Sequence, residues 1–268
     1  MAIRLVALDI DGTLLDSEGR LPPANAAAIA AARAAGVTVT LVTARQRQMT
    51  VPLVEELELT APLVLHNGAV VWLPQENREL LRLTIDLHHA RLIAAYADER
   101  EYELITTIDE ETFLRCQPGK RCGRLHEGLY ALPTNLEALI RPPTRIAVRD
   151  KAAALDIYRR FARQLADKTR LDIYFRSVEP WGLGIFNHRA SKGQALDFVC
   201  RLLGIRNDEV LAMGDNPVDA EMFPYVRFGI APSNAPGSVK AQATFVAPAN
   251  DEASVAWAIE RFVLKNGD

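Results

Sequence analysis

Residues 3–14 read IRLVALDIDGTL, and this stretch decides the fold. Its first half, residues 3–8, is a nearly continuous apolar run that is rich in β-forming residues. Such a run is typical of a parallel strand buried on both faces. Asp9 and Asp11 follow two residues apart, so in an extended chain their side chains point the same way. We therefore expect both acids to face one pocket at the carboxyl edge of a sheet.

The two acids of this stretch require a positive charge nearby. Two carboxylates held close together repel each other. A hard ion such as Mg²⁺ removes that repulsion and also attracts a phosphate dianion, which bare carboxylates would repel. Gly12 then allows a tight turn that leaves backbone amides free for phosphate oxygens. The alternative is that two aspartates simply end a strand at a turn.

The segments around this stretch alternate between strand and helix. Alanine-rich residues 24–35 predict a helix that stops at Gly36, residues 37–42 a second buried strand, and residues 46–57 a helix disturbed by Pro52. The C-terminal part repeats this rhythm, with predicted helices at 191–203, 218–223 and 252–264 and predicted strands at 210–213, 227–230 and 244–246. We predict an α/β fold with a doubly wound, mostly parallel, Rossmann-like core.

Between these two parts the pattern changes to alternating strands with separate helices. This change predicts an inserted α/β cap domain at residues 83–182, with the core catalytic domain in residues 1–82 and 183–268. The insert is large and lies between the polar strand ends of the N-terminal part and those of the C-terminal part. We therefore expect it to cover the active site, to open and close, and to select the leaving group.

Three later points of the chain place polar groups at predicted strand ends or helix starts. Thr43 can hydrogen-bond a phosphate, and Lys192 has the unfavourable sign for a helix N-terminus, which favours an anionic partner. Asp215 can complete a metal site, and Asp219 can hold a metal-bound water or the lysine. Each residue taken alone also fits a turn or helix cap. Their recurrence at one predicted sheet edge favours a functional site.

The order and spacing of these motifs resemble the haloacid dehalogenase-like phosphatases, and within them the Cof-type branch, subclass IIB. The resemblance spans nearly the whole chain, including the large insert between the second and third motifs. Residues 67–69 and residues 233–235 with Lys240 are similar to further recurring segments of that family.

This resemblance implies a Mg²⁺-dependent phosphatase that acts on a small phosphorylated metabolite, namely a sugar, polyol, acid or cofactor phosphate. Asp9 would be the nucleophile, and Asp11 would protonate the leaving oxygen and then activate water. Thr43 and Lys192 would bind the substrate phosphate. Mg²⁺ would be held by Asp9, the Asp11 backbone carbonyl, Asp215 and waters. The supporting residues would be Gly12, Gly214, Asp219 and Asn234.

The sequence departs from the family pattern at three positions. Val218 stands before the last acid, where the family commonly has Asn, and Ala44 stands where Gly usually follows the hydroxyl residue. Arg189 stands where a Gly often precedes the lysine motif. Valine cannot hydrogen-bond through its side chain. An alternative function is therefore a weakly active or non-catalytic member that binds phosphate ligands. A phosphotransferase or mutase is a further alternative.

Composition excludes several other classes of protein. The 268 residues carry a net charge of −3, which provides no global positive field for nucleic acid or an anionic membrane surface. No run of about 18 apolar residues occurs, so no membrane span is expected. Cys116, Cys122 and Cys200 form no CxxC pair and fit a reduced, cytoplasmic compartment. With His126 the first two match no standard zinc spacing.

Overall fold

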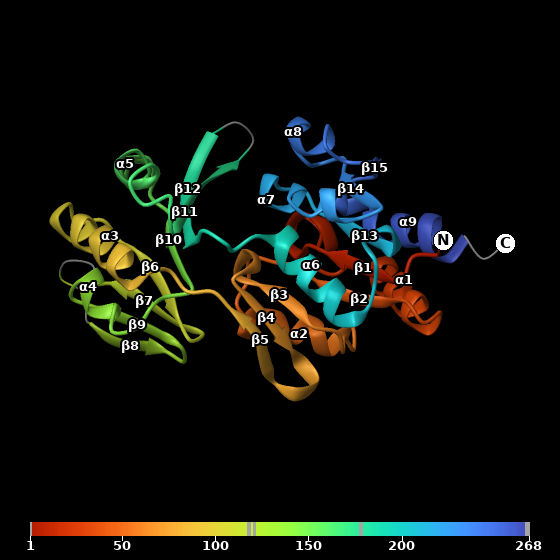
Figure 1. Cartoon of the computed structure of the whole chain (residues 1–268), viewed down its shortest axis with the longest axis horizontal. Helices are drawn as coiled ribbons and strands as arrows, with labels where there is room; N and C mark the ends of the chain where they lie inside the picture. Colours follow the sequence, from red (N-terminus) through yellow and green to blue (C-terminus); the bar gives the residue numbers. More distant parts are fainter. Residues whose placement is uncertain (1, 117–118, 120–121, 177–178, 266–268) are drawn as a thin grey trace. The chain divides into compact units, whose positions relative to one another are not determined.

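The chain forms two compact units. The computed structural model describes residues 2–116, 119, 122–176 and 179–265. One unit comprises Met1–Leu81 and Ser191–Asp268, and the other is the insert Arg82–Ala190 (Figure 1). The sequence placed the return to the core at 182/183. Residues beyond that point belong to β12 (Glu179–Asn187), which pairs antiparallel with β10 (Arg145–Val148). That pairing keeps them in the insert, so the division falls after Ala190.

The first unit contains a five-stranded parallel sheet in the order β15-β14-β13-β1-β2. The strands are β1 (Leu5–Leu8), β2 (Thr38–Leu41), β13 (Val210–Met213), β14 (Phe228–Pro232) and β15 (Phe245–Ala247). Strand β1 lies between β2 and β13, so the N-terminal and C-terminal parts of the chain enter one sheet. The predicted doubly wound, mostly parallel α/β core is therefore confirmed.

Helices cover both faces of this sheet. The longer ones are α1 (Pro23–Ala34), α2 (Arg47–Glu56), α6 (Lys192–Leu203) and α9 (Ser254–Ile259). Val6 and Leu8 pack in one apolar cluster with residues of α1 and α9, whereas Leu5 and Ala7 pack in another with residues of α6. Successive residues of a strand point to opposite faces. The run of apolar residues in β1 is unbroken because both faces are buried.

A small antiparallel sheet extends the first unit beside β2. Its order is β3-β4-β5, with bounds Leu63–Leu65, Val70–Leu73 and Arg78–Arg82. Strand β3 joins the main sheet through a single parallel bridge between Val42 and Val64. The chain reverses at His66–Gly68, so β3 pairs mainly with β4.

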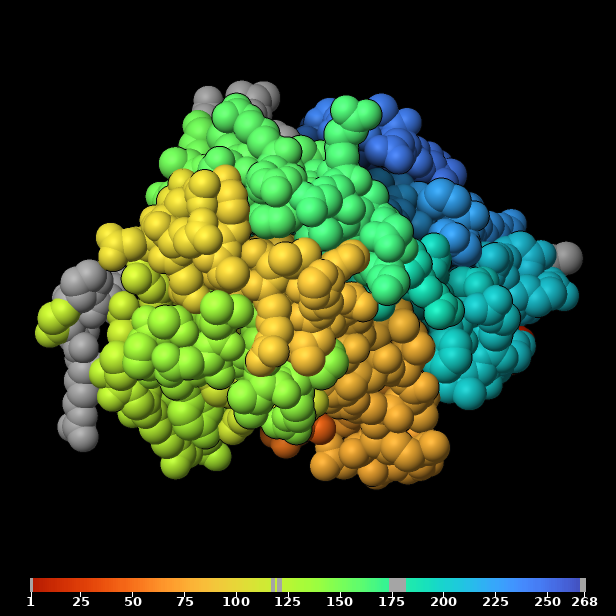
Figure 2. Space-filling view, turned by 60° about the vertical axis from the view of Figure 1, so that its left-hand side comes forward, coloured from red at the N-terminus to blue at the C-terminus, as the bar shows by residue number. Residues whose placement is uncertain are grey.

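The inserted unit has its own sheet and its own core. Seven strands run in the order β11-β12-β10-β6-β7-β9-β8. Their remaining bounds are Thr169–Arg176 (β11), Ile105–Ile108 (β6), Glu111–Arg115 (β7), Leu129–Leu132 (β9) and Gly123–His126 (β8). Helix α3 (Leu87–Glu99) lies beside α5 (Lys151–Phe161), where Tyr96 meets Phe161 edge-on with ring centroids 5.2 Å apart. Figure 2 shows α3 in yellow next to the green segment that includes α5.

The cysteines differ from the sequence-based expectation. Cys116, directly after β7, and Cys122, directly before β8, form a disulfide, and Cys200 is a buried thiol. The expectation of three reduced cysteines is therefore wrong for this pair. The short connection between β7 and β8 brings the two Cα atoms to 5.6 Å, within the range that a disulfide spans. With both sulfurs bonded to each other, the pair is not available with His126 as a metal site.

Among the described residues, none of the helices combines the length and the apolar character needed to cross a membrane.

Candidate active site

The site lies where three chain segments end at one edge of the parallel sheet. Leu8 is in register with both Leu41 and Met213. The next residues continue this pairing: the Asp9 amide donates to the Met213 carbonyl at 3.0 Å, and the Val42 amide donates to the Leu8 carbonyl at 2.8 Å. The register alone therefore brings the residues that follow β1, β2 and β13 to the same edge.

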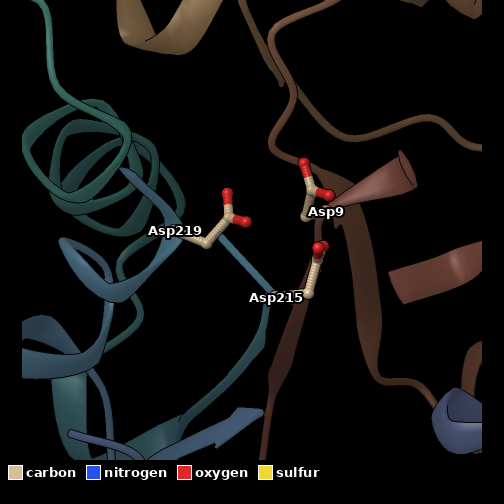
Figure 3. Close-up of side chains that lie close together, drawn as sticks. All are labelled: Asp9, Asp215 and Asp219. Carbon is tan, nitrogen blue, oxygen red and sulfur yellow. The ribbon is translucent and has the colours of Figure 1, made fainter. Parts of the chain in front are cut away.

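Three carboxylates gather at this edge. One oxygen each from Asp9, Asp215 and Asp219 lies within 4.8 Å of the others (Figure 3). Asp9 and Asp219 are buried, with 5% and 0% of their surface exposed. The sequence grouped Asp9 and Asp215 with Asp11 and gave Asp219 a supporting part. In the structure the side chain of Asp219 joins the cluster, whereas that of Asp11 is 63% exposed.

Lys192 supplies the positive charge within the cluster. Its Nζ donates to Asp9 Oδ1 at 2.6 Å and to Asp219 Oδ1 at 2.5 Å, and the side chain is almost fully buried. The lysine begins α6, whose N-cap Ser191 accepts a hydrogen bond from the Gln194 amide. One ammonium against three carboxylates leaves an excess of two negative charges when all are ionised. Oxygen ligands with this excess charge fit a hard divalent cation such as Mg²⁺.

The pKa values of Asp9, Asp215 and Lys192 all lie above their ordinary values. Burial, followed by the charge of Asp219, raises the pKa of Asp9 well above its usual value, although Lys192 opposes the change. Burial and Asp219 also raise the pKa of Asp215 to about 7. Burial lowers the pKa of Lys192, but Asp219 and Asp9 outweigh it and the net change is upward. The cluster therefore takes up positive charge readily, as protons or as a cation.

Gly12 leaves the room that Asp215 occupies. Its φ of +84° lies in the left-handed region, and a Cβ there would be 2.6 Å from Asp215 Oδ2. Thr13 Oγ1 donates to Asp215 Oδ1 at 3.0 Å, and Asn234 Nδ2 donates to the Gly12 carbonyl at 2.9 Å. The turn after β1 thus orients the acid after β13. The sequence singled out Gly12 and Asn234 but not the part of Thr13.

Asp219 is held from two sides. A Cβ at Gly214 would lie 2.2 Å from the Cβ of Asp219, so this close approach requires glycine. Asp219 Oδ2 accepts a hydrogen bond from the Asn216 amide at 2.8 Å, while Oδ1 accepts from Lys192. The acid is therefore fixed without any side-chain hydrogen bond from Val218, the residue that departs from the family pattern.

Thr43 and Asp11 are linked through one residue, Arg45. The buried Thr43 hydroxyl accepts a hydrogen bond from the Arg45 amide at 3.1 Å. The Arg45 guanidinium donates to both oxygens of Asp11, from Nε at 2.9 Å and from Nη2 at 2.7 Å. Sequence reasoning assigned no part to Arg45. The available signal was its place two residues after Thr43 in a motif at the end of a strand.

Three buried polar side chains donate hydrogen bonds to backbone carbonyls of the turn after β1. Asn25 Nδ2 donates to the Leu14 carbonyl at 2.9 Å, and Asn250 Nδ2 donates to the Leu15 carbonyl at 2.9 Å. Ser254 Oγ donates to the Thr13 carbonyl at 3.3 Å. Buried carbonyls need such partners. Sequence reasoning missed these residues, because nothing in the sequence relates residues near 250 to residues near 14.

Comparisons with known proteins agree with this architecture. The family described as haloacid dehalogenase-like hydrolase matches residues 6–259. The chain is 28% identical over 266 residues to a 5-amino-6-(5-phospho-D-ribitylamino)uracil phosphatase of Bacillus subtilis, covering 98% of this chain and 96% of that protein. It is 26% identical over 267 residues to the pyridoxal phosphate phosphatase of Escherichia coli, covering 96% and 97%.

Solved structures show the same fold. A haloacid dehalogenase-like hydrolase from Bacteroides thetaiotaomicron matches with a TM-score of 0.83 at 22% identity, covering 97% of this chain and 99% of that one. A subclass IIB sugar phosphatase matches with a TM-score of 0.80 at 19% identity, covering 97% and 98%. The chain belongs to the haloacid dehalogenase-like hydrolase family.

Proposed function

We propose that this protein is a Mg²⁺-dependent phosphatase that hydrolyses a small phosphorylated metabolite through an aspartyl-phosphate intermediate on Asp9. The observation that carries the proposal is the cluster of three carboxylates with oxygens within 4.8 Å of one another, in which Asp9 and Asp219 accept hydrogen bonds from the Lys192 ammonium. A cluster with two excess negative charges suits a divalent cation and, through it, a phosphate dianion.

Asp9 is the proposed nucleophile. Its carboxylate attacks phosphorus, and the bond to the leaving oxygen breaks. Lys192 donates a hydrogen bond to Asp9 Oδ1 at 2.6 Å and so orients the attacking group. Its ammonium is also proposed to donate hydrogen bonds to the phosphoryl oxygens. Thr43 is proposed to donate to the same phosphate from the end of β2, where charge spreads over the phosphoryl oxygens in the transition state. When bound by Asp9, Asp215 and the Asp11 backbone carbonyl, Mg²⁺ would neutralise charge on the attacking and phosphoryl oxygens.

Asp11 is the proposed acid and base. It first gives a proton to the leaving oxygen, then takes one from the water that hydrolyses the phosphorylated Asp9. Its exposed position suits this part, because the alcohol departs to solvent and the water arrives from it. Asp219 is proposed to support the site by holding Lys192, and Gly12, Gly214 and Asn234 by shaping the turns around the carboxylates.

The inserted unit is proposed to be the cap that selects the leaving group, in keeping with the subclass IIB relatives. The relatives named above act on phosphorylated ribitylaminouracil and on pyridoxal phosphate. We infer a substrate of comparable size, namely a sugar, polyol, acid or cofactor phosphate. A cytoplasmic location remains a prediction from the sequence.

The test is release of inorganic phosphate from p-nitrophenyl phosphate, followed by a screen of phosphorylated metabolites, with and without Mg²⁺. We expect Mg²⁺-dependent turnover that Asp9→Asn lowers by on the order of 10⁴-fold, because the amide is no nucleophile. Asp16→Asn is the matched control, since Asp16 lies on the same loop but pairs with Arg20. Turnover that survives in Asp9→Asn would contradict the proposal.

Val218 motivates the alternative of a weakly active or non-catalytic member. Binding of Mg²⁺ without turnover on any phosphomonoester would favour that alternative. Transfer of the phosphoryl group to an added alcohol or sugar, in place of water, would favour the phosphotransferase or mutase.

A further inference from the structure

The guanidinium of Arg45 donates hydrogen bonds to both carboxylate oxygens of Asp11. The two hydrogen bonds, 2.9 Å from Nε and 2.7 Å from Nη2, form a bidentate pair. Such a pair fixes the plane of a carboxylate as well as its position. The Asp11 side chain is 63% exposed, whereas that of Arg45 is 20% exposed. Arg45 therefore orders an acid that otherwise faces solvent.

Arg45 is itself anchored in the loop that follows β2. Its amide donates to Thr43 Oγ1 at 3.1 Å, and its carbonyl accepts from the His66 amide at 3.2 Å. The backbone of Arg45 is thus fixed to Thr43, which is also the residue proposed to hydrogen-bond the substrate phosphate. A guanidinium on a fixed backbone can hold its partner with little freedom.

Stability alone is a weak reason for this ion pair. Exposed ion pairs contribute little to the stability of a fold, because water screens the two charges. Orientation is a stronger reason, because an acid or base must stand within hydrogen-bond reach of the proton that it transfers. We propose that Arg45 is a positioning residue that aims the carboxyl group of Asp11 at the leaving oxygen and then at the hydrolytic water; this rests on the proposed function.

The step balances without any proton from Arg45. The proton leaves one Asp11 oxygen for the leaving oxygen, which keeps the electron pair of the broken P–O bond. The other Asp11 oxygen keeps a hydrogen bond from the guanidinium. In the second step the water oxygen attacks phosphorus and gives one proton to Asp11, while the P–O bond to Asp9 breaks and the Asp9 carboxylate keeps its electron pair. Arg45 donates hydrogen bonds throughout and remains charged.

The test compares two substrates that differ in their need for a general acid. p-Nitrophenolate departs without protonation, whereas the alkoxide of glycerol 2-phosphate does not, and kcat/KM reports the steps through departure of this group. In Arg45→Ala we expect kcat/KM to fall about tenfold to hundredfold more for glycerol 2-phosphate than for p-nitrophenyl phosphate. We also expect a pre-steady-state burst of p-nitrophenol, because water activation on Asp11 becomes slow.

Two variants serve as controls. Arg45→Lys keeps the charge but only one aligned donor, so its ratio of kcat/KM values should lie between those of the wild type and Arg45→Ala. Arg47→Ala removes a neighbouring guanidinium that donates to Asn77 Oδ1 at 3.2 Å, and its ratio should match that of the wild type.

The outcomes separate the two proposals. An equal loss on both substrates in Arg45→Ala, with a raised KM, would overturn the positioning part and assign Arg45 to substrate binding. An unchanged ratio without a burst would also overturn it. A wild-type chain without turnover on either substrate would overturn the proposed function itself.

Discussion

Asp9 and Asp11 lie two residues apart and occupy opposite environments. Asp9 is 5% exposed and shares a cluster with two other acids and Lys192. Asp11 is 63% exposed and is held by a single bidentate arginine. The turn at Gly12 lies immediately beyond this pair and brings Asp215 up beside Asp9.

The difference separates two physical tasks. In the buried cluster charges interact strongly, so removing one group leaves the others uncompensated. Around Asp11 water screens the charges, so removing a partner loosens geometry more than it costs free energy. Substitutions in the cluster should therefore change stability and metal binding as well as turnover, whereas substitutions at the exposed pair should change turnover with little effect on stability.

Lys192→Met should give the largest effect on stability. The substitution leaves three neighbouring carboxylates without their ammonium, which should lower the free energy of unfolding by about 3–5 kcal/mol without Mg²⁺. Urea unfolding measures this change, and added Mg²⁺ should restore part of the loss. Lys240→Met is the control, because the hydrogen bond that Lys240 donates to the Ser233 carbonyl, at 2.9 Å, is exposed. An equal loss of unfolding free energy in the two variants would contradict the prediction that the cluster depends on its charge more than the surface does.

Gly12→Ala should have the next largest effect. An alanine there adopts a left-handed φ and places its Cβ 2.6 Å from Asp215 Oδ2, so we expect a loss of about 2–3 kcal/mol and weaker Mg²⁺ binding. Gly19→Ala is the matched control: its φ is +76° and no atom lies within 4 Å of the added Cβ. It should cost about 1 kcal/mol and leave Mg²⁺ binding unchanged. Calorimetric Mg²⁺ titration distinguishes the two; equal Mg²⁺ affinities would contradict the prediction.

The pH dependence of Mg²⁺ binding should give the smallest effect. Burial and Asp219 raise the pKa of Asp215 from 3.8 to about 7. The metal-free folded chain therefore binds more protons than the unfolded chain between these values, and this contribution to stability fades as pH rises through 7. Mg²⁺ competes with the proton, so its affinity should fall below pH 7 by up to about tenfold per pH unit. Thermal unfolding with and without Mg²⁺ at pH 6 and pH 8 checks this. A larger shift in Tm at pH 6 would contradict it.

Much of the fold could be predicted because its signals are local. The apolar run before Asp9 predicted a strand covered on both faces, and Val6 and Leu5 indeed point into different apolar clusters. The strand at 210–213 was predicted with the bounds that the structure gives it. The short helix α7 (Pro217–Ala220) was predicted too long, because a 3₁₀ turn over Phe223–Tyr225 follows it.

Less of the candidate site could be predicted, because side-chain environment depends on distant contacts. Spacing alone gave Asp9 and Asp11 the same direction. The chain turns helically from Ile10, between the two acids, and Asp11 pairs with Arg45. Asp219 therefore joins Asp9 and Asp215 in the cluster instead. The ion pair of Asp11 with Arg45 joins residues 34 positions apart.

The sequence by itself determined which segments become strands and which acidic and hydroxyl side chains follow them. It also determined that a large insert divides the sequence of the core domain. These properties depend on local apolar patterns and on the residues that directly follow them. Tertiary structure alone decided which acids lose water and where the insert ends. These depend on contacts between distant residues, such as Lys192 with Asp9, whose strength comes from burial that the whole fold creates.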